Sequence, residues 1–321
     1  FGLASAMPAP AFSPLIQQED SNQSWAVFGN TSFALTDSLE IGAGLRHFED
    51  EQEKITSGGV EAGKFDSLTP RIYVNYDISD NVMTYASVAK GFRSGGFGFG
   101  FGTPVYGPET VWTHEIGTKM SLLDSRLSAE FAFFYSEYDD YQTTGISSNP
   151  GASLFTILNG NSAEIKGIDW TLSWQASDNF SFDFSGNYVD TEFTKIDLIQ
   201  ATSPHAVGDP IDFIPDYSFM ISGNYDFTWK SKPGFVRLDY SEKGESTYRN
   251  RSIGPHWFST SDVISMLNLN LDLEWSDSLS YGLFARNLLD DRGYTDSNAV
   301  QNFASRSRPR TVGFEVAVKF D

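Results

Sequence analysis

The feature that most constrains the fold is a strict alternation of apolar and polar side chains, repeated in one segment after another. It is clearest where Leu267, Leu269, Leu271, Leu273 and Trp275 are separated by Asn268, Asn270, Asp272 and Glu274. A period of two places successive side chains on opposite faces of a β-strand. One face therefore meets an apolar medium and the other meets polar groups. A membrane β-barrel requires this pattern, apolar toward lipid and polar toward its lumen.

The connections between these segments alternate between short and long. The short ones fall at 36–38, 79–81, 124–125, 176–179, 230–234 and 276–278, and the long ones near 49–64, 93–111, 139–162, 192–216, 244–263 and 290–310. The pattern predicts about thirteen antiparallel strands with every long connection at one rim, which is typical of outer-membrane barrels. For segment 82–92 the sequence does not indicate which side chains face lipid and which face the lumen, because both faces of the strand carry apolar and polar residues.

Other all-β folds fit this arrangement less well. A soluble β-sandwich has Greek-key connections with no consistent side for its long loops. A β-propeller has a repeat of about 40–50 residues, which is absent from this sequence. The tryptophans are also sorted by end, with Trp174, Trp229 and Trp275 at short turns and Trp25 and Trp112 near long connections. Aromatic girdles at two membrane interfaces predict that distribution.

Composition excludes several classes of function. A net charge of −20 argues against nucleic-acid binding, which requires clustered Lys and Arg. The chain has no cysteine, so disulfides and thiol chemistry are excluded. No run approaches the roughly 18 apolar residues of a membrane-spanning helix. Residues 1–23 do not resemble a signal peptide, and we expect them to be the end of an extracellular loop in a longer protein.

No motif indicates an enzyme or a resident metal. The glycine-rich segment 91–102 lacks the Gly-Lys-Ser/Thr ending of a phosphate loop. His47, His114, His205 and His256 have no metal-ligand spacing, and no serine lies in a Gly-x-Ser-x-Gly elbow. We therefore expect no catalytic residue, no metal and no cofactor.

Aromatic and basic residues in the long connections are the candidate ligand-binding residues. Arginines concentrate in two of these connections against an acidic background, where they can meet an anionic chelate. Contact with lipopolysaccharide phosphates, or pairing with loop carboxylates, is the alternative role. The candidate set is Arg93, Phe97, Phe99, Phe101, Tyr106, Tyr248, Arg249, Arg251, His256, Trp257, Arg306, Arg308 and Arg310.

Several segments, in order, resemble a known family. AKGFRSGGF, HEIGTK and AFFYSEYDDYQ, then LFARNLLDDRGYTD followed by RPRTVGFEVAVKF, closely resemble TonB-dependent outer-membrane receptors of the iron-complex branch. The likeness extends over nearly the whole chain from Trp25. One departure is that the family usually ends on an aromatic residue, whereas Asp321 follows Phe320 here.

The resemblance implies both architecture and function. The family forms a plugged barrel of about 22 strands, so residues 24–321 would supply about thirteen carboxyl-terminal strands, with the plug domain outside this chain. It implies active uptake of a ferric siderophore or other iron complex, energised by TonB, across the outer membrane of a Gram-negative bacterium. The implied partners are TonB, the ligand, outer-membrane lipid and lipopolysaccharide. Import of carbohydrate or cobalamin, or a passive porin, remains the alternative.

Overall fold

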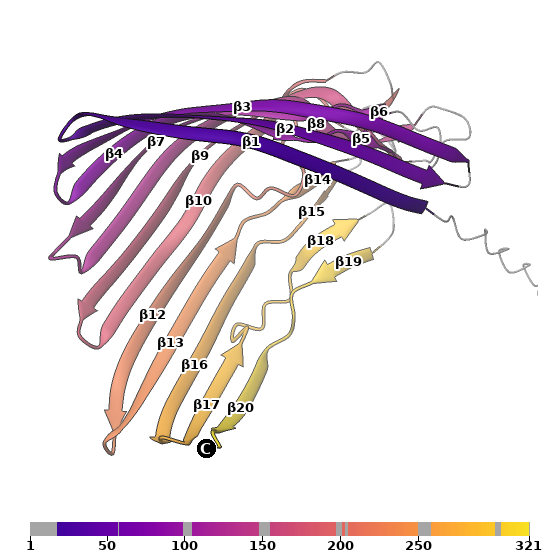
Figure 1. The fold of residues 1–321 in the computed structure, drawn as a ribbon. Coiled ribbons are helices and arrows are strands. Elements are labelled where there is room, and N and C mark those ends of the chain that lie inside the picture. The colour runs from indigo at the N-terminus through magenta and orange to yellow at the C-terminus, as the bar shows by residue number, and fades with distance from the viewer. Residues whose placement is uncertain are drawn as a thin grey trace, which may run out of the picture.

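The computed structural model describes residues 18–56, 58–98, 105–147, 155–196, 201–202, 205–249, 258–298 and 303–320. Its main feature is one antiparallel sheet in which strands follow one another in chain order (Figure 1). The strands along the sheet are β1 (Gln18–Thr36), β2 (Leu39–Thr56), β3 (Gly59–Ser79), β4 (Val82–Arg93), β7 (Glu109–Leu122), β8 (Leu127–Ser147), β9 (Phe155–Ser177), β10 (Phe180–Lys195), β12 (Tyr217–Trp229), β13 (Lys232–Lys243), β16 (Ile264–Ser276), β17 (Leu279–Arg286) and β20 (Thr311–Val318).

Shorter strands lie in the long connections. They are β5 (Gly96–Phe97), β6 (Val105–Tyr106), β11 (Ala201–Thr202), β14 (Thr247–Arg249), β15 (Phe258–Thr260), β18 (Tyr294–Asn298) and β19 (Phe303–Arg306). β11 pairs with β8, and the others form the hairpins β5–β6, β14–β15 and β18–β19. Within the described ranges, no helix is long and apolar enough to cross a membrane.

All the short turns lie at one rim of the sheet, and the long connections lie at the other (Figure 1). Left-handed backbone closes two of the turns, at Leu123–Ser125 with φ of 56°, 55° and 64°, and at Lys230 and Ser231 with φ of 52° and 61°. Trp229, beside the second of these turns, meets Trp275 of the neighbouring hairpin, with ring centroids 6.4 Å apart. The predicted topology and strand number are therefore confirmed.

The two faces of the sheet differ in chemistry. Directly paired residues point to the same face of a sheet, so Leu238, Leu269 and Ala285 form one row, and Arg237, Asn270 and Phe284 form a row on the other side. We call the first side the apolar face and the second the polar face. The apolar face leaves large side chains exposed, including Leu238 at 46% and Leu283 at 41%. Such a surface is unfavourable in water and suits contact with lipid.

The predicted phase of 267–275 is confirmed, and the phase that the sequence left open is now defined. In β4, Val88 pairs with Ile72 and Ala86 pairs with Val74, on the apolar face. Tyr85 pairs with Gly117 on the polar face, two residues from Lys119.

Two predicted loops are wrong. Residues 49–64 mostly continue β2 and β3, and much of 139–162 belongs to β8 and β9. Both faces of these extensions carry polar residues. They therefore lack the alternation of apolar and polar residues that marks the rest of the large sheet, which we call the wall. Cross-strand contacts hold them instead, as between Lys64 Nζ and Glu49 Oε1 at 2.7 Å. β1 likewise begins at Gln18, inside the range predicted as loop.

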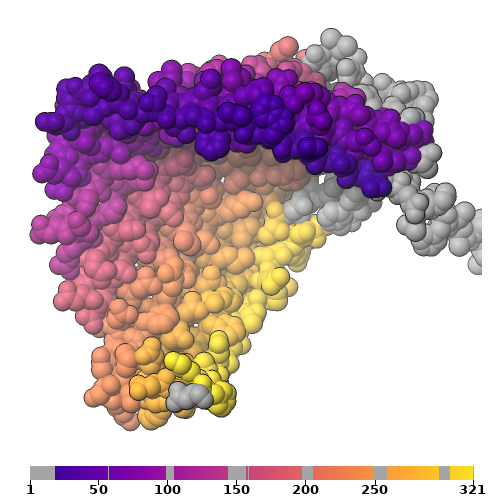
Figure 2. Space-filling view, viewed as in Figure 1, coloured from indigo at the N-terminus to yellow at the C-terminus, as the bar shows by residue number. Residues whose placement is uncertain are grey.

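The sheet is open, because β1 and β20 each pair with one neighbour only. It curls so that β1–β3 overhang a hollow (Figure 2). A small buried core of Ala163, Phe193 and Ile211 lies toward the rim with the long connections. This rim carries the candidate site.

Candidate functional site

The glycine-rich connection between β4 and β7 folds over the polar face and is held there by β2. The Ser94 hydroxyl donates to Asp50 Oδ2 at 2.9 Å, and the Gln52 amide donates to the Gly95 carbonyl at 3.1 Å. Lys54 Nζ donates to the Gly98 carbonyl. Asp50 and Lys54 are both buried, at 3% and 4% exposure. Charged groups at such depth need close partners, so these contacts fix the first half of the connection.

β8 and β9 hold the same glycine-rich connection at both of its ends. The side-chain amide of Gln142 donates to the carbonyls of Ser94 at 2.9 Å and Gly107 at 3.1 Å, and Asn159 donates to Gly107 at 2.9 Å. The carboxylate of Glu109 accepts the backbone N–H of Gln142 at 2.7 Å. The connection is therefore fixed at both roots.

The structure places three of the candidate residues around this connection. Phe97 and Tyr106, on β5 and β6, line one cavity with Gln52 and Lys54. Its volume is about 370 Å³, within the range of small-ligand pockets. Arg93 is exposed and pairs across strands with Glu109, at the edge of this region. Phe99 and Phe101 lie outside the described residues.

A bulge in β8 builds the buried core of the rim. Asp140 has a φ of 55°, and the pairing with β9 shifts between Tyr138 and Tyr141. Because of the extra residue, both tyrosines lie on the polar face. The Tyr141 ring then meets Phe193 edge to face at 5.5 Å.

The connection between β10 and β12 is clamped onto this core. Phe193 N–H donates to the Asp209 carbonyl at 2.9 Å, and Gly208 N–H donates back to Phe193 at 2.9 Å. His205, only 6% exposed, stacks on the Phe193 ring at 4.4 Å. Its Nε2 lies 3.4 Å from Asp212 Oδ2. The segment is thus a folded part of the rim.

The same segment presents Phe213 in a strained conformation. Its φ is 63°, which is an outlier for a bulky residue. Phe213 N–H donates to the Thr247 carbonyl at 3.0 Å, and its ring stacks on Tyr248 at 5.0 Å and 16°. The Phe213 side chain is still 52% exposed. Residue type alone indicates Tyr248 as a candidate, but no local sequence pattern marks a left-handed phenylalanine such as Phe213.

The arginine-rich connection after β17 is organised by Asn287, which is 3% exposed. The Asn287 amide donates to the carbonyls of Asp291 at 2.8 Å and Arg308 at 2.7 Å, and Asp291 N–H donates to Asn287 Oδ1 at 3.0 Å. Asp290 Oδ1 accepts the Arg310 N–H at 2.9 Å. One buried amide thus joins the end of β17 to the segment entering β20.

Asp291 adds a charged acceptor to this network. Its carboxylate accepts backbone N–H groups from Gly293 at 2.8 Å and Ser265 at 3.0 Å. Burial opposes ionisation of Asp291, but these hydrogen bonds and one from Ser307 outweigh it, and the pKa of the carboxyl is lowered.

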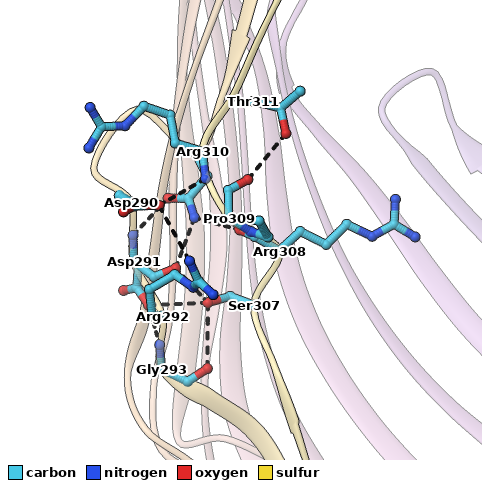
Figure 3. A network of polar contacts seen from close by, with 10 residues as sticks. Asp290, Asp291, Arg292, Gly293, Ser307, Arg308, Pro309, Arg310 and Thr311 are labelled. Atoms are coloured by element: carbon cyan, nitrogen blue, oxygen red, sulfur yellow. Dashed lines mark hydrogen bonds and ion pairs between the residues drawn. The ribbon is translucent and has the colours of Figure 1, made fainter.

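The three predicted arginines of this connection do not form one cluster. Arg306 lies over the Tyr294 ring at 4.1 Å and donates to its hydroxyl. Arg308 and Arg310 are exposed, and their side chains leave the network in opposite directions (Figure 3). In the other arginine pair, Arg249 ends β14, while Arg251, His256 and Trp257 lie outside the described residues.

The rim therefore provides exposed aromatic rings, guanidinium groups and a polar cavity. Across the described part of the chain, no group of His, Cys, Asp or Glu has a metal-binding arrangement. The arrangement can bind a ligand by stacking, hydrogen bonding and charge.

Comparison with known proteins gives consistent results. A family described as TonB dependent receptor-like, beta-barrel matches residues 4–288. The pesticin receptor of Yersinia pestis is 24% identical over 314 residues, covering 92% of this chain and 43% of the receptor. The metal-pseudopaline receptor of Pseudomonas aeruginosa is 30% identical over 161 residues, covering 50% of this chain and 21% of the receptor.

Solved structures share the fold. The ferric yersiniabactin uptake receptor of Yersinia pestis superimposes with a TM-score of 0.76 at 19% identity, over 95% of this chain and 46% of that receptor. A siderophore receptor of Acinetobacter baumannii gives a TM-score of 0.77 at 18% identity, over 94% and 44%. The chain thus spans less than half of the relatives it matches.

The matched region includes every strand from β1 to β17. The chain therefore belongs to the TonB-dependent receptor β-barrel family, whose members lie in the outer membrane of Gram-negative bacteria.

Proposed function

We propose that this chain is the carboxyl-terminal barrel part of a receptor that imports a ferric siderophore or other iron complex, energised through TonB. The observation that carries the proposal is the glycine-rich connection fixed over the polar face, with Phe97 and Tyr106 beside a cavity. A connection folded inward narrows the lumen and offers contacts to a ligand at its mouth. The uptake functions named for several structural neighbours support the same proposal.

Binding at the rim follows from the chemistry of its side chains. Phe213 and Tyr248 offer aromatic area, and Arg308 and Arg310 offer exposed guanidinium groups. Guanidinium groups match carboxylate and catecholate oxygens, and a flat ring can stack on the aromatic pair. We propose no covalent step. TonB acts through segments outside this chain.

A second role is proposed for the exposed arginines. Their alternative partners are the phosphates of lipopolysaccharide at the outer surface. The apolar face, with Leu238 and Leu283 exposed, contacts the lipid of the outer membrane.

Iron uptake by cells expressing the full-length receptor tests the proposal. Ferric siderophore uptake should require TonB and should stop when the proton gradient is collapsed. Replacing Arg249, Arg251, Arg308 and Arg310 together by Gln should lower uptake at limiting ligand with surface expression unchanged. Arg126→Gln at the opposite rim, where Arg126 donates to the Gln175 carbonyl at 3.1 Å, is the control.

Each alternative has its own outcome. Uptake that persists without TonB indicates a passive porin. TonB-dependent uptake of a sugar or cobalamin, with no iron complex transported, moves the receptor to another substrate class. Unchanged iron uptake in the arginine variant removes these arginines from the site and leaves the receptor function standing.

A further inference from the structure

A cavity on the polar face, at the base of the long connections, has a floor that the strand register defines. One row of paired residues crosses four strands as Ser185, Met220, Ser241 and Met266. The next row toward the rim is Asn187, Ser218, Lys243 and Ile264. Paired residues share a face, so hydroxyl, thioether, amide and ammonium groups lie together on the polar face.

All of these residues except Asn187 line a cavity of about 390 Å³, and Thr295 of the β18–β19 hairpin borders it. This volume accommodates a ligand or a large part of one. Apolar surface comes from Met220, Met266 and Ile264. Thioether side chains adapt to irregular apolar shapes, so this floor suits a ligand with apolar surface.

Lys243 is the ammonium group of this cavity, and neighbouring carboxylates are engaged elsewhere. Asp239 binds Arg237 at 2.8 Å and the Ser222 hydroxyl at 2.6 Å. Glu242 points to the other face of the sheet, where the hydroxyls of Tyr217 and Tyr240 donate to it at 2.9 and 2.6 Å.

Lys243 itself has an exposed side chain and makes no ion pair with any described residue, including the exposed Glu245 two positions on. Lys119, by contrast, is held by Glu130 at 2.8 Å on the same face. An ammonium without an ion-pair partner among the described residues is available to an incoming anion.

We propose that this cavity is a second ligand-contact site, at the base of the β14–β15 and β18–β19 hairpins, that binds the anionic part of an iron chelate through Lys243. The carboxylate, catecholate or phenolate oxygen accepts from Nζ, and the serine hydroxyls complete its hydrogen bonds. The apolar part of the ligand packs on Met220 and Met266. The inference rests on the proposed function and adds a preference for anionic over neutral chelates.

Equilibrium binding to the full-length receptor tests this site. The probes are an anionic ferric tris-catecholate and a neutral ferric tris-hydroxamate. Lys243→Gln should weaken binding of the anionic probe about tenfold, as expected for loss of one charge-assisted contact. It should leave binding of the neutral probe unchanged. Lys232→Gln, at the start of β13 beside a short turn of the opposite rim, should change neither.

A second measurement uses the absence of cysteine in this chain. Thr295→Cys, in a receptor without other cysteines, should react with a membrane-impermeant maleimide added to cells. The anionic chelate should protect it.

The outcomes separate the two hypotheses. The second site alone is overturned if Lys243→Gln weakens binding of both probes equally, if it weakens neither, or if the Cys at position 295 does not react. A wild-type receptor that binds neither chelate overturns the proposed function together with it.

Discussion

The wall and the rim of this sheet are held together in different ways. In the wall, each residue is positioned by the same rule, alternation between an apolar and a polar face, as in the row Leu238, Leu269 and Ala285. In the rim, position depends on individual side chains that bind distant backbone, such as Gln142 and Asn287. We therefore expect the wall to tolerate many single substitutions that keep the polarity of each face. The rim should be more sensitive, because a few side chains make its contacts.

The largest effect should come from placing a charge on the lipid side of the wall. Leu271→Arg should cost about 2–4 kcal/mol near the membrane midplane, because the guanidinium loses its hydration. Asn270→Arg, one residue away on the polar face, is the matched control and should be tolerated. Denaturant titration of the full-length receptor folded in phospholipid vesicles measures both. Equal sensitivity of the two positions would contradict the assignment of the faces.

Replacing Asn287 should destabilise the rim locally. Asn287→Ala leaves the carbonyls of Asp291 and Arg308 without their amide donor and should cost about 1–3 kcal/mol. Hydrogen exchange should increase in residues 287–311 and stay unchanged in β2 and β3. Asn179→Ala is the control, because Asn179 is exposed and donates a single bond to Asp226 at 3.1 Å. An increase of exchange throughout the wall would show that rim and wall form one cooperative unit.

A smaller effect tests the strained backbone of Phe213. Glycine adopts left-handed φ freely, so Phe213→Gly should be more stable than Phe213→Ala by about 1 kcal/mol. At Phe219, inside the wall strand β12, the order should reverse, since glycine costs about 0.5–1 kcal/mol there. Denaturant titration of the four variants compares the two sites. The same order at both would mean that the left-handed conformation of Phe213 is not maintained in the full-length receptor.

The smallest effect should appear in acid. The folded-state pKa of Asp291 lies below its ordinary value of 3.8, so its stabilisation is complete above that pH and is lost as the pH falls through the folded pKa. Hydrogen exchange of the 287–311 segment should therefore increase below about pH 4. Asp291→Asn should remove this pH dependence. If the variant keeps it, another carboxyl is responsible.

The wall could be predicted from sequence because the alternation of apolar and polar residues is visible within each segment. In Leu267–Trp275 this alternation indicates both that the segment is a strand and which side chains face lipid. The short connections indicate which ends of the strands share a rim. The extensions of β2–β3 and β8–β9 were mistaken for loops because polar residues occupy both of their faces. At the rim, Tyr248 could be selected by residue type. The strained backbone of Phe213 could not be foreseen, and neither could the contact of Arg306 with Tyr294, because both depend on the fold.

The extra residue at Asp140 also bears on how such barrels change in length. Elsewhere in the wall, losing one residue inverts every later side chain of that strand, from lipid to lumen. At the bulge β8 instead absorbs one extra residue, so Tyr141 stays on the face of Tyr138 and reaches Phe193. A deletion of Asp140 would remove that extra residue and leave Tyr141 opposite Asn161, on the face of the rim core. A one-residue deletion at the bulge should therefore keep the rim core, whereas a one-residue deletion within the wall should not keep the two faces of the strand.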